Sequence, residues 1–198
     1  MLTPQISSRR MSEDVPWAAD NGRFSNPRKY TDEKFLAWLM KMQPFRDRCL
    51  FAVAPDTFGD AEATLRDSVP LLPRIRELGY RTAIVAQPWM TVEHTPWDLI
   101  DALFVGGPNE WQHSHQLESL VREAKRRGLW VHMGRVNGIK RMRYAMSIGC
   151  DSVDGTFLKF GPDANMPRLQ KWLDSLNSHP MLWDDHERKG YRPAKEDV

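Results

Sequence analysis

The chain has 198 residues and a hydrophobic fraction of 41%, which is enough for one domain with a sizeable buried core. Its formal net charge is only +2, so the total charge creates no strong field for a polyanionic partner. No apolar run approaches the roughly 18 residues that span a bilayer, and the first residues show no signal-peptide pattern. We therefore expect a soluble, cytoplasmic protein without membrane contacts.

Apolar runs and helical stripes alternate along the chain. A short strand precedes Asp20, and residues 31–42 show a helical apolar stripe behind a polar cap. Residues 61–78 also favour a helix, which Pro70 and Pro73 should bend or split. The other expected strands cover residues 49–54, 82–86, 102–105, 130–133 and 152–153, and the other expected helices cover residues 114–127, 138–148 and 166–176.

This alternation predicts a parallel α/β architecture with right-handed crossovers. A full eight-fold barrel usually takes about 250 residues, so we expect a reduced or incomplete (β/α) TIM-like barrel. An open doubly wound sheet is the alternative. The expected domain covers residues 1–198, with a core over about residues 16–178 and a polar tail over residues 180–198. An incomplete barrel also favours a homodimer.

The sequence gives no signature of a metal site or a disulfide framework. Its two cysteines, Cys49 and Cys150, form no CxxC pair, and both lie in apolar surroundings. The histidines that suggest a metal site have no clear carboxylate partner among their neighbours. These are His94, His113, His115 and His132. We therefore expect no metal and no cofactor.

Three acidic residues follow strands at their carboxyl ends, namely Asp20, Asp56 and Asp154. In a β/α barrel these ends form the active-site face, so we expect the three carboxylates at one site. Each alone is also a common turn residue. Further candidates at or just beyond strand ends are Phe24, Gln87, Gly106, Gly107 and Met133.

The order of these strand-end motifs resembles that of the tRNA-guanine transglycosylases, and more closely that of the DpdA-type 7-deazaguanine DNA transglycosylases of phages and bacteria. The resemblance covers about residues 16–160. It departs from the tRNA enzymes in lacking their zinc-binding cysteines and the Pro-Thr-Arg that follows their nucleophile. The motifs are Asp20-Asn21-Gly22-Arg23-Phe24, Ala54-Pro55-Asp56, Val85-Ala86-Gln87, Val105-Gly106-Gly107, His132-Met133-Gly134 and the run from Ala145 to Asp154.

The resemblance implies an exchange of guanine in DNA for a free 7-deazaguanine base such as preQ0. Asp154 would attack C1′ to form a covalent aspartyl–DNA intermediate, and Asp20 would act as acid and base. The residues that would contact the base are Phe24, Asp56, Gln87, Gly106, Gly107 and Met133. The residues that would hold DNA phosphates are Arg135, Lys140, Arg141, Arg143 and Lys159.

Two rival functions remain open from the residues alone. One is a barrel hydrolase or lyase that uses the same carboxylates on a small molecule. The other is a catalytically inactive nucleic-acid-binding subunit that keeps the fold.

Overall fold

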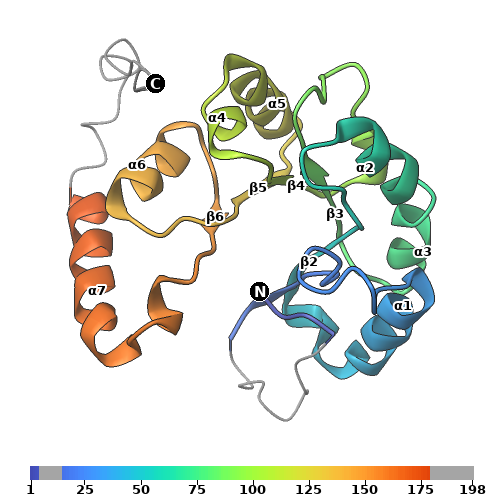
Figure 1. The fold of residues 1–198 in the computed structure, drawn as a ribbon, viewed down its shortest axis with the longest axis horizontal. Helices are drawn as coiled ribbons and strands as arrows, with labels where there is room; N and C mark the ends of the chain where they lie inside the picture. Colours follow the sequence, from blue (N-terminus) through green and yellow to red (C-terminus); the bar gives the residue numbers. More distant parts are fainter. Residues whose placement is uncertain (5–14, 179–198) are drawn as a thin grey trace.

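The computed structural model describes residues 1–4 and 15–178 as an α/β half barrel (Figure 1). Six parallel strands form one sheet in the order β1-β2-β3-β4-β5-β6. Because this order never reverses, the sheet lacks the switch point of a doubly wound fold. The predicted incomplete TIM-like barrel is confirmed. The strands are β1 (Trp17–Ala19), β2 (Cys49–Val53), β3 (Thr82–Ala86), β4 (Ala102–Val105), β5 (Trp130–Met133) and β6 (Ser152–Val153).

The helices lie outside the curved sheet, and local sequence signals explain most of their ends. The Thr31 and Ser114 side chains accept hydrogen bonds from the first turns of α1 and α5. The expected break near Pro70 divides residues 61–78 into α2 and α3. The helices are α1 (Asp32–Lys41), η2 (Gln43–Arg48), α2 (Ala61–Ser68), α3 (Leu72–Glu77), η3 (Trp97–Leu99), α4 (Asn109–Gln112), α5 (His115–Arg126), α6 (Ile139–Ser147), η4 (Phe157–Lys159) and α7 (Pro162–Ser178).

Four helical segments differ from the expectations. The short helices η2, α4 and η4 were not expected, because each is too short to show a helical period. Helix α7 begins four residues earlier than expected, at Pro162, and continues through Pro167. Pro162 stands at the first helical position, where its missing N–H has no helical partner, whereas Pro167 lies inside α7 and removes one N–H from the helical ladder without ending the helix.

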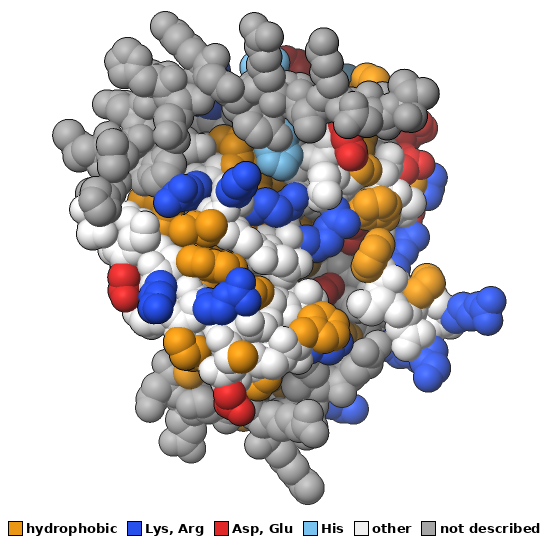
Figure 2. All heavy atoms as spheres, turned by 60° about the vertical axis from the view of Figure 1, so that its left-hand side comes forward, with side chains coloured by type: hydrophobic (Ala, Val, Ile, Leu, Met, Phe, Trp, Pro, Cys, Tyr) orange, Lys and Arg blue, Asp and Glu red, His pale blue; other side chains and the backbone are white. Residues whose placement is uncertain are grey.

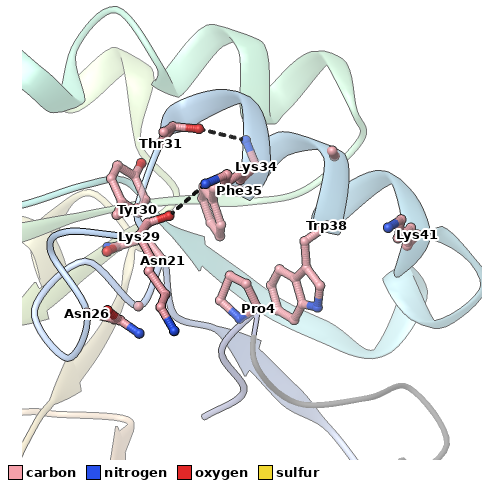
Figure 3. A pocket seen from close by; sticks show the side chains of 12 residues that line it. Pro4, Asn21, Asn26, Lys29, Tyr30, Thr31, Lys34, Phe35, Trp38 and Lys41 are labelled. Carbon is pink, nitrogen blue, oxygen red and sulfur yellow. Dashed lines mark hydrogen bonds between the residues drawn. The ribbon is translucent and has the colours of Figure 1, made fainter.

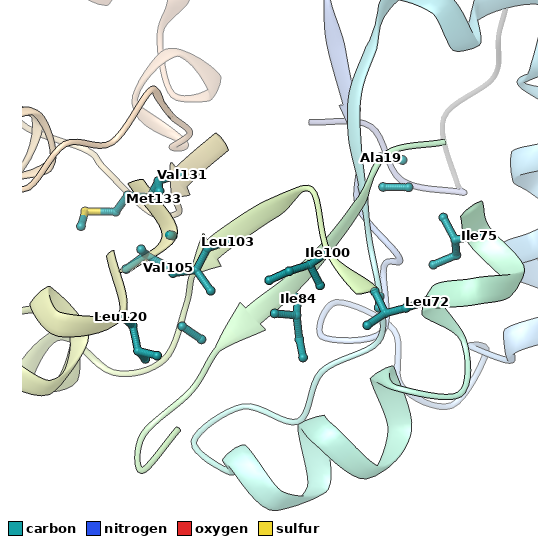
Figure 4. Packing of buried hydrophobic residues seen from close by; sticks show 14 of the residues in the cluster. Ala19, Leu72, Ile75, Ile84, Ile100, Leu103, Val105, Leu120, Val131 and Met133 are labelled. Atoms are coloured by element: carbon teal, nitrogen blue, oxygen red, sulfur yellow. The ribbon is translucent and has the colours of Figure 1, made fainter. Parts of the chain in front are cut away.

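The two faces of the sheet bury different apolar clusters. Ile84 and Leu103 point outward and pack with helix residues such as Leu72 and Leu120 (Figure 4). Residues at the alternate strand positions form a second cluster inside the barrel, to which no helix contributes. It consists of Ala18, Phe51, Val53, Ala83, Val85 and Ala102, with Leu50, Phe104 and Trp130 packed against it.

The described residues do not cover the expected tail, and they bear on the expected lack of membrane spans only within their own range. The polar tail over residues 180–198 lies outside them. Within residues 1–4 and 15–178, no helix has both the length and the apolar character that crossing a membrane requires.

Candidate active site

The three strand-end aspartates lie at the carboxyl edge of the sheet and affect one another electrostatically. Asp20 follows β1, Asp56 lies beyond β2, and Asp154 follows β6. The negative charge of Asp154 raises the pKa of Asp20, and that of Asp20 raises the pKa of Asp56. Asp20 therefore lies within electrostatic range of both Asp154 and Asp56 at this edge of the sheet.

A backbone N–H and a nearby imidazole favour the ionised form of Asp154. Burial alone would raise its pKa, but the proximity of His132 and the hydrogen bond from the backbone N–H of Arg135 outweigh burial, so the pKa of Asp154 lies below its usual value. The Arg135 N–H lies 2.9 Å from Oδ1. The His132 Nε2 lies 3.4 Å from Oδ2, a contact that falls short of a full hydrogen bond.

A chain of buried and half-buried polar groups leads to Asp154 from inside the barrel. The Trp130 Nε1–H donates to Oγ of Ser152 at 2.8 Å, and this Oγ lies 2.7 Å from Nδ1 of His132. While it accepts the indole N–H, the Ser152 hydroxyl still has one hydrogen that it can donate to Nδ1. In that arrangement a neutral imidazole carries its hydrogen on Nε2, facing Asp154.

The residues around His132 keep it in place. It lies opposite Ser152 in the ladder between β5 and β6. Its ring packs against Phe51 and Phe104, with centroid distances of 5.5 and 4.9 Å. It is 4% exposed, so its contact with Asp154 is shielded from water.

Asp20 and Asp56 have the opposite electrostatic character. Burial raises the pKa of both carboxyl groups, and hydrogen bonds only partly oppose it. Oδ1 of Asp20 accepts the Gly22 N–H at 2.9 Å. Oδ2 of Asp56 accepts from Nε2 of Gln87 at 2.7 Å, and Oε1 of Gln87 accepts the Gly59 N–H at 2.9 Å. Gln87 therefore joins the β2 and β3 loops.

Gly106, Gly107 and Met133 lie at the strand ends, where packing and backbone geometry constrain them. A Cβ on Gly106 would come within 2.4 Å of a Val85 methyl group, and Gly107 has a left-handed φ of 76°. Met133 is 1% exposed and belongs to the outer cluster that packs against the helices. The structure therefore does not place Met133 with the carboxyl groups.

An exposed aromatic and cationic group lies on the loops at the same edge. Phe24 follows β1 and Phe58 follows β2, and their ring centroids are 5.4 Å apart. The Arg135 guanidinium lies over the Phe58 ring at 5.3 Å and donates to the Gly107 carbonyl. Trp89 on the β3 loop is 81% exposed with a φ of 74°.

The other expected phosphate-binding residues are spread over α6 and η4. Lys140 and Lys159 are exposed, whereas Arg141 donates to Asn109 at 2.9 Å and also to Gln112, so that it fastens α6 to α4. Arg143 is half-buried on α6. Figure 2 shows several Lys and Arg side chains on the face turned forward from the left side of Figure 1, with apolar side chains between them.

A cavity of about 390 Å³ lies beside the site rather than over it. It opens between the β1 loop and α1, and Figure 3 shows Asn21, Tyr30 and Trp38 on its wall with Lys29 and Lys34. Asp20, Asp56 and Asp154 do not line it.

No family model matches this sequence, and no curated protein matches it. Solved structures do match the fold. The Bacillus subtilis YkuI protein, with an EAL domain, in complex with substrate c-di-GMP and calcium, gives a TM-score of 0.50 at 15% identity, over 86% of this chain and 45% of that chain. The fold resembles an EAL-domain barrel. The PaMucR phosphodiesterase in its c-di-GMP complex gives 0.46 at 14% identity, over 72% of this chain and 60% of that chain.

The chain thus spans about half the length of these solved chains, and the likeness concerns the fold. It corrects the expectation from the motifs: the transglycosylase family, the base exchange in DNA and the 7-deazaguanine substrate are wrong. Asp and Gly are common turn residues, so such motifs after strands are not specific to one family, and here Gly106 is required by packing against Val85. DNA and a second copy of the chain as partners stay predictions.

The strand-end carboxylates show no preformed ligand set for a metal ion such as the calcium of the YkuI complex. Among the described residues, no group of three or more His, Cys, Asp or Glu side chains is arranged to hold one. The oxygens Oδ1 of Asp154, Oδ1 of Asp20 and Oδ2 of Asp56 already accept hydrogen bonds from protein groups.

The sequence does not identify three residues of the site as site residues. His132 was weighed only as a metal ligand, and Trp130 and Ser152 were assigned only to strands. The available signal was the period of two in β5, which places Trp130 and His132 on the inner face.

Proposed function

We propose that the chain is an enzyme that cleaves a small molecule by acid–base chemistry at the carboxyl edge of the half barrel. The observation that carries the proposal is the pair Asp154 and Asp20, whose pKa values are displaced in opposite directions at one site. Carboxyl groups with divergent environments divide the roles of base and acid between them.

Asp154 acts as the base in this proposal. The Arg135 N–H and His132 keep it ionised, and a water molecule hydrogen-bonded to it gives up a proton as the oxygen attacks the substrate. The His132 Nε2–H then stabilises the carboxyl group as its charge changes. With its hydrogen on Nε2, His132 needs no ring rotation during the step.

Asp20 acts as the acid. Burial and the nearby charge of Asp154 keep its proton bound to higher pH than usual. Because Oδ1 accepts the Gly22 N–H, Oδ2 carries the proton to the leaving oxygen. The bond to the leaving group breaks as that proton moves, and one water is consumed. Proton exchange with solvent afterwards restores both carboxyl groups.

The fold directs the choice of the first substrates to test. The YkuI structure is described with c-di-GMP as its substrate, so phosphodiesters form the first class, and small esters and glycosides form the second. The purified protein is incubated with c-di-GMP, with bis-p-nitrophenyl phosphate and with p-nitrophenyl esters and glycosides. Each reaction is run with calcium, with magnesium and with EDTA.

If a substrate is cleaved, three variants test which residues are responsible. Asp154→Asn and Asp20→Asn each remove one proton-transfer group and should lower kcat by about 10²- to 10⁴-fold. Asp98→Asn, an exposed aspartate of η3, is the matched control and should keep the full rate. Turnover that persists in Asp154→Asn would refute the assignment of the base.

A further inference from the structure

Three side chains at the carboxyl edge are exposed although neighbouring residues hold them in place. Phe24 is 66% exposed and Phe58 is 44% exposed, and Arg135 is an exposed residue of the β5 loop. We propose that these three residues form a substrate clamp that selects a small anion carrying a planar ring. The clamp rests on the proposed function, because it supplies the substrate class of that site.

Arg135 has the properties of an anion-binding group. Among the described residues, no carboxylate forms an ion pair with its guanidinium, whereas Arg23 pairs with Asp67 and Arg76 pairs with Asp101. A guanidinium has five N–H donors, and the contact with the Gly107 carbonyl engages only part of them. The remaining donors match the oxygens of a phosphate or a carboxylate.

The position of Arg135 places the anion next to the reacting groups. Its own backbone N–H donates to Asp154, so its side chain begins one hydrogen bond away from the proposed base. Its φ of 61° lies in the left-handed region, which few residues other than glycine adopt. The Phe58 ring and the Gly107 carbonyl then fix the guanidinium, so little order is lost when an anion binds.

The two phenylalanines supply the surface for a ring. They come from different loops, and their rings are inclined at 49° with centroids 5.4 Å apart. The two inclined rings form an apolar surface that a third ring can contact. Aromatic rings at such distances gain from stacked or edge-on contact with a third ring. Arg135 over Phe58 places a positive charge at one end of this surface. A planar ring joined directly to an anion matches both features at once.

The test measures binding without turnover, by NMR titration of the intact chain with four probes. Phenyl phosphate carries both features, inorganic phosphate has no ring, phenol has no anion, and cyclohexyl phosphate has a puckered ring. Phenyl phosphate should bind about tenfold more tightly than each of the other three, because only it uses the cation and the flat surface together. Equal affinity for cyclohexyl phosphate would overturn the planar-ring requirement.

Variants locate the binding. Arg135→Gln and Phe58→Leu should each weaken phenyl phosphate by about tenfold, and Phe24→Leu should also weaken it. The matched control is the pair Arg48 and Phe45 on η2, before β2, where a guanidinium lies 5.7 Å from a ring at the other edge of the sheet. Arg48→Gln and Phe45→Leu should leave the affinity unchanged.

Failure of the clamp and failure of the proposed chemistry give different results. Unchanged affinity in Arg135→Gln, with the folded spectrum retained, overturns the clamp whatever the activity. Asp154→Asn keeps the clamp and should still bind phenyl phosphate. If binding depends on Arg135 and Phe58 while no substrate is cleaved, the clamp stands and the acid–base proposal fails.

Discussion

The Ser152 hydroxyl offers the sharpest test of how the site is built. In Ser152→Ala, the Trp130 indole N–H and the His132 Nδ1 both lose their partner. A buried polar group without a partner costs about 1–3 kcal/mol, and both groups lie where water has limited access. Since Trp130 is only half-buried, we expect a total loss of about 2 kcal/mol in the free energy of unfolding.

This loss is measurable by heat denaturation. For a domain of this size, 1 kcal/mol corresponds to about 2–4 °C, so Tm should fall by about 4–8 °C. The imidazole should also lose its fixed tautomer, which ¹⁵N NMR of His132 detects directly. With a weaker Nε2–H contact, the pKa of Asp154 should rise towards its usual value.

Ser152→Thr is the matched control, because it keeps the hydroxyl and suits a strand. It should retain the tautomer and most of the stability. If Ser152→Ala has the Tm of the unchanged protein and the same single tautomer, the hydrogen-bond chain does not orient His132.

Three further predictions concern stability. Asp20→Asn should stabilise the fold at neutral pH, because burial raises the folded-state pKa of Asp20 and so penalises its charged form. The gain should vanish as the pH falls below the ordinary pKa of 3.8, which urea unfolding at neutral pH and below pH 3.8 checks. Gly106→Ala should lower the free energy of unfolding by about 1–3 kcal/mol, since the new Cβ would lie 2.4 Å from a Val85 methyl group. Gly138→Ala, whose new Cβ meets no atom within 4 Å, is its control, and equal Tm values for the two variants would contradict the packing argument. Leu103→Ala should cost about 2–5 kcal/mol because Leu103 is completely buried against the helices, and a loss below 1 kcal/mol in urea would contradict its place in the core.

Much of the fold follows from the sequence because its signals are local. The apolar runs of β2 to β5 mark buried parallel strands, and Thr31 and Ser114 mark helix starts. The position of the carboxyl groups follows from the same pattern, since parallel strands bring their carboxyl ends to one edge.

The function did not follow from the motifs, because turn chemistry repeats in every β/α unit. Gly106 and Met133 fitted a substrate-binding pattern, but in the structure one is required by a neighbouring methyl group and the other is packed against helices. His132 and Ser152 are 20 positions apart in the chain, and only the pairing of β5 with β6 brings them together.

The most direct test of the central claim is a ¹³C NMR titration of the aspartate carboxyl groups. Assignments of Asp154 and Asp20 come from the two Asn variants. The account predicts that Asp154 titrates below 3.8 and Asp20 above it, so that a window of pH holds one ionised and the other protonated. Titration of both groups together near 3.8, or of Asp20 below Asp154, would contradict the division into base and acid.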